Sequence, residues 1–403
     1  MTTDMKKLED YKDDVITCGH CMGCNQFNYW TLDEWVECCP SGKKFGFISY
    51  YAVGRMEIAR AVIEGEIKEP SEALKELVWA CTTCGACALT CKEFKGMDNV
   101  AIIEALRTKL AEMEWGPMPQ HLGFSRSIAE NENPYGEPHG QRFDWLPKDA
   151  KIDPNAELAY FVGCTSAYRE KELAKNTVEI LNKTNTPFRI LGSDEICCGS
   201  PLLRTGMQKQ AIELAKSNVE AIEKAGIKKL IFSCAGCYRT ILVDYPELLG
   251  KKLNFEVEHI TQFLDRLIKE GKIKLKELNK TVTYHDPCHI GRGIMSDSRP
   301  RRKGLYKQPR KILEAIPGLK FVEMVRNKEN AWCCGAGGGV KAAFKDMALE
   351  TAIDRINEAV DTGADILVSS CPFCQRNLMD AIKESGAKIE FKDIVELVND
   401  LII

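Results

Sequence analysis

The spacing of apolar residues predicts a helical N-terminal part. Ile102, Leu106 and Leu110 recur at helical intervals, which indicates a helix over about residues 98–113 with one buried face. Stretches of similar character predict two more helices, over about residues 50–67 and 71–79. The stretch that follows, residues 115–155, contains six prolines and is interpreted as a proline-rich linker.

Beyond residue 155, short apolar runs alternate with longer amphipathic stretches. Leu230–Ser233 and Ile366–Ser369 have the length and composition of buried strands. Each run follows an amphipathic stretch and a glycine, Gly226 or Gly363, at which a helix would end in a left-handed cap. Because strands and helices alternate, the pattern predicts an α/β fold with parallel strands.

The second half of the chain is an internal duplication. Three landmarks recur in the same order: a cysteine after an apolar run, a Cys-Cys-Gly segment and a Cys-x-x-Cys segment. Cys288 follows Cys164 by 124 residues, and the other two landmarks recur after 136 and 137 residues. The predicted organisation is an N-terminal module over residues 1–114, the linker over 115–155, a first repeat over 156–275 and a second repeat over 276–403.

Apart from its cysteines, the composition is that of an ordinary globular protein. Hydrophobic residues make up 44 % of the chain, and the net charge of −3 gives no indication of nucleic-acid binding. No apolar run approaches the ~20 residues that span a bilayer, and residues 1–8 do not resemble a signal peptide. We therefore expect a cytoplasmic protein without a transmembrane segment, with peripheral docking to a membrane partner left open. No Gly-rich nucleotide fingerprint occurs, so a flavin is expected in another subunit.

The nineteen cysteines fall into tight groups separated by long stretches without cysteine. A secreted disulfide scaffold would be shorter and would usually contain an even number of cysteines. Tight groups favour metal sites, where several thiolates converge on one centre. Nine cysteines lie in the N-terminal module, and the other ten are divided equally between the two repeats.

The N-terminal module contains two runs with a cysteine at every third position, which is ferredoxin-like spacing. Such a loop wraps three corners of an iron cube, whereas structural zinc usually takes two Cys-x-x-Cys arms. By resemblance to two-cluster ferredoxins, one cubane [4Fe-4S] cluster would be held by Cys18, Cys21, Cys24 and Cys91. The other would be held by Cys81, Cys84, Cys87 and Cys39, the last because Pro40 follows it. Thirteen residues separate Cys24 from Cys38, so the choice between Cys38 and Cys39 stays open.

Each repeat supplies five cysteines, one more than a cubane cluster needs. They are Cys164, Cys197, Cys198, Cys234 and Cys237, and then Cys288, Cys333, Cys334, Cys371 and Cys374. Adjacent cysteines in a strand would point to opposite faces, so each Cys-Cys-Gly segment must turn to aim both at one centre. Glycine permits that turn and lets the backbone approach a cluster closely. The candidate cofactor-binding glycines are Gly199, Gly335, Gly337 and Gly338.

These two five-cysteine motifs resemble the CCG domains of heterodisulfide reductase and its relatives. Combined with the N-terminal module, they are similar to the D subunit of methanogen heterodisulfide reductase. They also resemble iron–sulfur subunits of glycolate and lactate oxidases and of some aromatic-ring-reducing complexes. The resemblance covers nearly the whole chain and accounts for all nineteen cysteines. It implies a helical two-cluster ferredoxin-like domain followed by two duplicated α/β CCG domains that face each other.

The resemblance also implies a function. In the family, a complete five-cysteine set is associated with a non-cubane [4Fe-4S] cluster. Two such clusters would cleave or form a disulfide, with electrons relayed through two cubane clusters. The implied partners are a small-molecule thiol or disulfide and other subunits of a redox complex, namely a flavoprotein or a membrane cytochrome. The alternative is an electron-transfer subunit that serves a flavoprotein acting on a hydroxy acid or another organic substrate; a metal-stabilised scaffold is a third, non-redox alternative.

Histidines and arginines near the cysteine motifs are further candidates. His285 and His289 are candidate catalytic residues that protonate a thiolate product, and the alternative for His285 is a hydrogen bond that holds a turn. Three arginines follow cysteine motifs and would bind an acidic substrate tail or, alternatively, form salt bridges: Arg204, Arg239 and Arg376. The basic residues from Arg299 to Arg310 are interpreted as a solvated loop, with a docking patch as the alternative.

Overall fold

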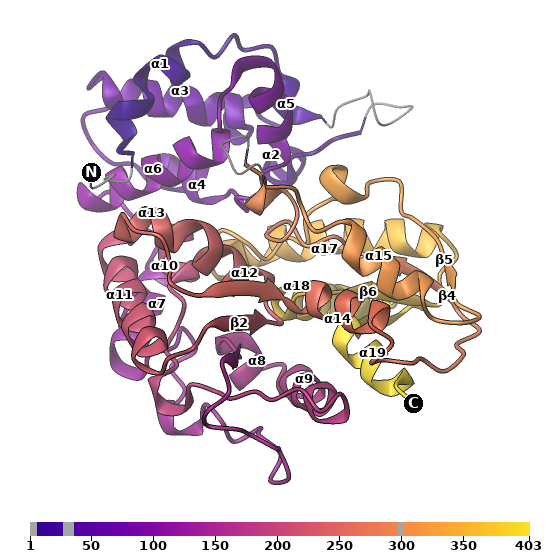
Figure 1. Ribbon diagram of the computed structural model, residues 1–403. Helices are drawn as coiled ribbons and strands as arrows, with labels where there is room; N and C mark the ends of the chain where they lie inside the picture. Colours follow the sequence, from indigo (N-terminus) through magenta and orange to yellow (C-terminus); the bar gives the residue numbers. More distant parts are fainter. Residues whose placement is uncertain (1–5, 27–35, 297–301) are drawn as a thin grey trace.

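The computed structural model describes residues 6–26, 36–296 and 302–403, and Figure 1 shows their arrangement. Of the basic residues singled out above, Arg299 and Arg301 lie outside these ranges. The N-terminal module is helical. Its elements are η1 Leu8–Tyr11, α1 Lys12–Ile16, η2 Gly23–Asn25, α2 Pro40–Phe45, η3 Ile48–Tyr50, α3 Ala52–Ile63, α4 Glu72–Trp79, α5 Ala86–Lys95 and α6 Asn99–Glu112. The three predicted helices are confirmed as α3, α4 and α6, and the Asp98 carboxylate caps α6 by accepting the backbone N–H groups of Val100 and Ala101.

The stretch interpreted as a linker is largely folded. It contains α7 Pro119–Asn131, which begins with a proline at its first position, and the short turn η4 His139–Gln141. Ile128 and Trp145 are buried in the largest apolar core of the molecule, together with residues of both repeats. Proline content alone therefore did not distinguish a flexible linker from a segment that packs.

The first repeat is a three-stranded parallel sheet with strand order β1-β2-β3. Its strands are β1 Leu158–Phe161, β2 Lys229–Phe232 and β3 Glu256–His259. Its helical elements are α8 Cys164–Tyr168, α9 Lys171–Lys183, η5 Gly192–Asp194, α10 Ser200–Thr205, α11 Gln208–Lys224, α12 Ala235–Arg239, the π-helical turn η6 Thr240–Asp244, α13 Tyr245–Leu249 and α14 Ile260–Lys269. The predicted helix end at Gly226 is confirmed, because this residue has a φ of +68°.

The second repeat is a four-stranded parallel sheet with strand order β5-β4-β6-β7. Its strands are β4 Thr281–Tyr284, β5 Lys320–Phe321, β6 Ile366–Ser369 and β7 Glu390–Asp393. Its helical elements are η7 Arg292–Ile294, α15 Lys307–Glu314, η8 Lys328–Asn330, α16 Val340–Ala343, α17 Lys345–Asp361, α18 Pro372–Ser385 and α19 Ile394–Leu401. Two parallel sheets confirm the predicted α/β fold class.

The N-terminal module packs against both repeats, and Figure 1 shows it lying along one side of the pair. Arg107, fully buried on α6, donates hydrogen bonds to backbone carbonyls of all three parts. Its acceptors are the carbonyl oxygens of Val78, Trp79 and Cys81 in the module, Arg204 in the first repeat and Gly338 in the second. The three parts therefore form one packed body around this side chain. Among the described residues, no helix combines the length and the hydropathy needed to cross a bilayer.

Candidate metal centres

The five cysteines of the first repeat gather where its parallel strands end. Cys164 follows β1, and Cys234 and Cys237 follow β2, at the carboxyl edge where open α/β sheets place their sites. Cys197 and Cys198 reach the same place from the loop before α10. The thiols are in side-chain contact in the order Cys164, Cys197, Cys198, Cys237, Cys234, and all five residues are buried. We call these residues the first five-cysteine set.

The second repeat builds the same arrangement, which we call the second five-cysteine set. Its thiols are in contact in the order Cys288, Cys333, Cys334, Cys374, Cys371. Cys288 follows β4 and Cys371 follows β6, so the positions on the sheet are equivalent in the two repeats. Cys288 is partly exposed, and the other four residues are buried.

Each Cys-Cys-Gly segment makes the turn that the sequence predicts. Gly199 has a φ of +81° and Gly335 a φ of +84°, in the left-handed region that favours glycine. The N–H of Gly199 donates to Cys197 Sγ at 3.4 Å, and the N–H of Gly335 donates to Cys333 Sγ at 3.3 Å. These turns bring both adjacent thiols of each repeat into one set.

The two sets touch each other and the N-terminal module. The thiols of Cys234 and Cys371, each the first cysteine of a Cys-x-x-Cys segment, are in side-chain contact. Cys84 of the module contacts Cys333 in the same way. The thiols therefore form a continuous series from the module through the second set to the first.

The N-terminal cysteines form two groups. One consists of Cys18, Cys21, Cys24 and Cys91, the set expected from the ferredoxin resemblance. Burial raises the pKa of Cys24 to about 11, and the nearby thiols of Cys91 and Cys18 contribute to this rise. The Asn99 side-chain amide donates to Cys91 Sγ at 3.2 Å. A polar partner of this kind stabilises a buried sulfur that carries negative charge.

The other N-terminal group lines one small cavity and consists of Cys38, Cys39, Cys81, Cys84 and Cys87. The structure thus brings both candidates for the fourth ligand, Cys38 and Cys39, to the same place. Their polar contacts differ. Both thiols donate to a backbone carbonyl, Cys38 to that of Cys24 at 3.2 Å and Cys39 to that of Tyr50 at 3.8 Å, but only Cys39 Sγ also accepts an N–H, that of Gly42 at 3.4 Å, among the described residues.

Gly337 and Gly338 lie against the N-terminal module. A Cβ on Gly337 would lie 2.6 Å from the carbonyl oxygen of Thr82, and one on Gly338 would lie 2.2 Å from that of Cys81. Both positions therefore exclude larger residues through this packing. The predicted approach of these glycines to a cluster stays a prediction.

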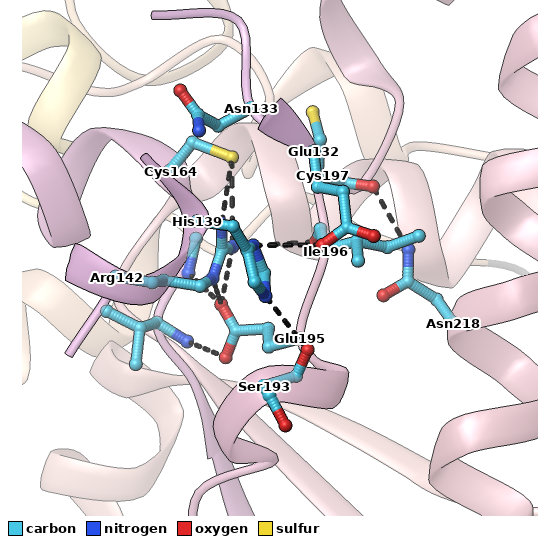
Figure 2. Close-up of polar contacts among 12 residues, drawn as sticks. Glu132, Asn133, His139, Arg142, Cys164, Ser193, Glu195, Ile196, Cys197 and Asn218 are labelled. Atoms are coloured by element: carbon cyan, nitrogen blue, oxygen red, sulfur yellow. Dashed lines mark hydrogen bonds and ion pairs between the residues drawn. The ribbon is translucent and has the colours of Figure 1, made fainter. Parts of the chain in front are cut away.

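Arg142, in the stretch interpreted as a linker, reaches the first five-cysteine set. Figure 2 shows its guanidinium between Cys164 and Glu195. Its two terminal nitrogens lie 3.6 and 3.7 Å from Cys164 Sγ, and one of them forms a 2.8 Å ion pair with Glu195. Contact with Cys197, followed by the Arg142 charge, lowers the pKa of Cys164. Sequence reasoning missed Arg142 and Glu195, because neither lies in a motif and only the fold brings them together.

Glu195 links Arg142 to the backbone that follows β1. Glu195→Ala is expected to lower the free energy of unfolding by about 3 kcal/mol. Its carboxylate accepts the N–H groups of Val162 and Gly163 at 3.0 and 2.9 Å, in addition to Arg142. The substitution leaves a buried guanidinium without its carboxylate. Anaerobic denaturant unfolding measures the loss, with Asp194→Ala at the neighbouring exposed position as the control. Equal stability of the two variants would contradict the prediction.

The two candidate catalytic histidines differ in their surroundings. His285 follows β4, and its Nδ1 accepts the Nε–H of Arg355 at 3.0 Å. His289 lies beside the first repeat, where a Cβ on Gly236 would be 3.6 Å from its Nδ1. Burial, followed by the charges of Arg239 and Arg204, lowers the pKa of His289 well below its usual value. His289 is therefore neutral near neutral pH.

The arginines that follow cysteine motifs are engaged in ion pairs, as one of the two interpretations expects. Arg204 pairs with Glu104 and Asp244, and Arg376 pairs with Glu170 at 3.3 Å. Arg239 lies 3.8 Å from both Glu104 and Asp244 and donates to the carbonyl oxygen of Gly293. Arg310 is also paired and buried, with Asp286 and Glu323, so this end of the predicted basic loop is not solvated.

The donor set fits iron–sulfur clusters. All nineteen cysteines are free thiols. They converge in two groups in the N-terminal module and two sets in the repeats, and backbone or amide N–H groups point at several sulfurs. Soft thiolate ligands in such numbers, with N–H donors around the sulfur, are typical of iron–sulfur sites.

Comparisons with known proteins agree with this chemistry. The model of the CCG family, described as a cysteine-rich domain, matches residues 158–242 and 282–379. The D subunit of the dihydromethanophenazine:CoB–CoM heterodisulfide reductase of Methanosarcina barkeri is 47 % identical over 81 % of this chain and 78 % of its own length. The B subunit of a fumarate reductase (CoM/CoB) of Methanothermobacter marburgensis is 31 % identical over 98 % of this chain and 74 % of its own length.

A further relative is the EtfAB:quinone oxidoreductase of Syntrophomonas wolfei, which is 32 % identical over 80 % of this chain and 46 % of its own length. The names of these relatives describe different reactions. The chain itself belongs to the CCG-domain family of iron–sulfur oxidoreductases that includes the D subunit of heterodisulfide reductase.

Proposed function

We propose that this chain is the catalytic iron–sulfur subunit of a heterodisulfide-reductase-like complex. In the proposed reaction a disulfide accepts two electrons and two protons and gives two thiols, and the reverse reaction forms the disulfide. When bound, two non-cubane [4Fe-4S] clusters in the five-cysteine sets would supply the electrons one at a time, relayed through two cubane clusters in the N-terminal module. A flavoprotein or a membrane cytochrome is the proposed electron partner.

The observation that carries this proposal is the contact between two complete five-cysteine sets at Cys234 and Cys371. A reaction that delivers one electron to each of two bonded sulfur atoms needs two centres side by side. The contact between Cys84 and Cys333 supports an asymmetric order, in which a thiol of the N-terminal module directly contacts the second five-cysteine set. The burial of nine of these ten cysteines keeps water away from both sets.

We also propose Cys39 as the fourth ligand of the second N-terminal group. Its sulfur accepts a backbone N–H at the start of α2, which stabilises a thiolate. Among the described residues, no N–H donates to the sulfur of Cys38, which contacts the carbonyl oxygen of Cys24 at 3.2 Å. Cys38 would then be the spare cysteine.

Anaerobic iron and acid-labile sulfide analysis, combined with EPR of protein oxidised in the presence of thiols, tests the proposed function. Four clusters require about sixteen iron atoms per chain, and substrate sulfur bound at a five-cysteine set would give a signal that appears only with thiol. About eight iron atoms in fully loaded protein, without a thiol-dependent signal, would overturn the proposal.

The second candidate function is electron relay to or from a flavoprotein that acts on another organic substrate. The relative named EtfAB:quinone oxidoreductase favours it, because that protein is 32 % identical over 80 % of this chain and its name describes no disulfide chemistry. The same analysis separates the two functions, since a relay subunit would show no signal that depends on thiol.

A further inference from the structure

The second repeat holds a histidine against its cysteine set, and the backbone fixes its position. His285 is buried and directly follows β4. Its backbone N–H donates to the carbonyl oxygen of Val368 at 2.8 Å, and its own carbonyl oxygen accepts the hydroxyl of Ser369 at 3.1 Å. Both contacts are with the neighbouring strand, so the residue is anchored from two sides.

Arg355 determines which ring nitrogen of His285 carries the proton. The Nε of an arginine always carries a hydrogen, and here it donates to His285 Nδ1 at 3.0 Å. Nδ1 is therefore an acceptor, and the single N–H of the ring is on Nε2. Arg355 is itself held by an ion pair with Glu358 at 2.7 Å and by the carbonyl oxygen of Arg326 at 2.8 Å.

The imidazole of His285 lies beside two thiols of the second set. Among the described residues, Nε2 of His285 is buried and has no hydrogen-bond partner. A ring nitrogen of His285 and the sulfurs of Cys334 and Cys374 lie within 4.8 Å of one another, and Cys334 makes a side-chain contact with the imidazole. A buried N–H without an acceptor is destabilising, so a thiolate at Cys334 is its natural acceptor.

This tautomer excludes one other role for His285, that of an iron ligand through Nε2. A nitrogen that carries a proton cannot coordinate iron through its lone pair. His285 is thus positioned to donate one hydrogen bond through Nε2.

The first repeat lacks this donor. Phe161 is the counterpart of His285, by the 124-residue spacing that relates Cys164 to Cys288. Its ring packs against Phe232 at a centroid distance of 5.4 Å and offers no N–H. Arg355 lies on α17, and the 137-residue spacing places Asn218 of α11 at the equivalent position. Asn218 donates to the carbonyl oxygen of Cys197. The two repeats therefore share a scaffold and differ at both members of this pair.

We propose that His285, positioned by Arg355, donates its Nε2–H to the sulfur of Cys334 and raises the reduction potential of the centre held by the second repeat. The inference rests on the proposed function, because it presumes a cluster in each five-cysteine set. A hydrogen bond to a cluster sulfur stabilises the reduced state, which carries one more negative charge. Arg142 is balanced by Glu195 and Arg355 by Glu358, whereas the buried Arg292 adds a positive charge near Cys288 and Cys333 of the second set, so the test varies His285 alone. His285 is thus a positioning residue that makes the two centres electronically unequal.

The test is an anaerobic redox titration of the loaded full chain with dithionite and mediator dyes, followed by EPR. His285→Asn keeps an acceptor for Arg355 but is too short to reach Cys334, and His285→Phe copies the first repeat. Both are expected to shift the midpoint potential of one centre to a more negative value, with iron content and the other centres unchanged. His285→Gln, whose amide N–H extends to the position of Nε2, is expected to restore the potential in part. Phe161→Leu, a change of packing at the matched position, is expected to leave the second-repeat centre unshifted.

The outcomes separate the inference from the proposed function. Fully loaded wild-type protein with about eight iron atoms would reject the clusters of the repeats, and with them the proposed function. About sixteen iron atoms, with equal potentials in wild type, His285→Asn and His285→Gln, would overturn the role of His285 alone.

Discussion

Cys334→Ala is expected to lower the iron content by about four atoms per chain and to reduce disulfide turnover to background. Cys334 lies at the middle of the second five-cysteine set, in contact with both Cys333 and Cys374. It is also the acceptor proposed for His285. The substitution leaves four thiols in the second set, whereas the proposed non-cubane cluster requires five. Cys198→Ala is the equivalent change in the first set and is expected to have the same effect there.

The cubane clusters are expected to survive both changes, because the N-terminal module contributes neither residue. Low-temperature EPR of the reduced protein distinguishes the remaining clusters. Cys38→Ala is the matched control, since its thiol is expected to be the spare one, and it is expected to retain all the iron. A Cys334→Ala protein that kept its full iron content and spectrum would show that the ligand assignment is wrong.

Arg107→Ala is expected to lower the free energy of unfolding by about 4 kcal/mol, the largest stability loss that we predict for a residue other than cysteine. The guanidinium is fully buried and donates only to carbonyl oxygens, in the N-terminal module and in both repeats. Burial lowers the pKa of Arg107 to about 10, so the group stays protonated near neutral pH. The substitution removes these hydrogen bonds together and opens a cavity where the three parts meet.

Thermal and denaturant unfolding under anaerobic conditions measure this loss. Lys109→Ala on the same helix is the control, since it breaks only a partly exposed ion pair with Glu9 and is expected to change stability by less than about 1 kcal/mol. Unfolding of Arg107→Ala in two separate transitions would agree with a role of Arg107 in joining the N-terminal module to the two repeats. An unchanged single transition would contradict the prediction.

Gene duplication gave the two repeats the same thiol geometry but left their polar surroundings free to differ. The first set is contacted by the buried Arg142–Glu195 pair, and the second by His285 with Arg355 behind it. The spacing of 136 residues places Ala331 where the first repeat has Glu195. Two sets with equal ligands and unequal partners suit a pair of one-electron centres that act in a fixed order.

The sequence by itself determined the features that depend on local pattern. Helical periodicity located α3, α4 and α6 to within a few residues. Alternation of short apolar runs with amphipathic stretches predicted the two parallel sheets, and the glycine after each cysteine pair predicted a left-handed turn. The order of the cysteines predicted the five members of each repeat's set, because the same five landmarks recur in both repeats, whereas the grouping in the N-terminal module came from the ferredoxin resemblance.

Only the tertiary structure decided how these parts meet. Contacts of Cys234 with Cys371 and of Cys84 with Cys333 join segments more than 130 residues apart, and no local period encodes them. Arg142 reaches Cys164 only because the presumed linker packs on the first repeat. Likewise, the proton on His285 is set by Arg355, 70 residues away. Local sequence specifies which groups are available, whereas burial and long-range packing decide which of them become partners.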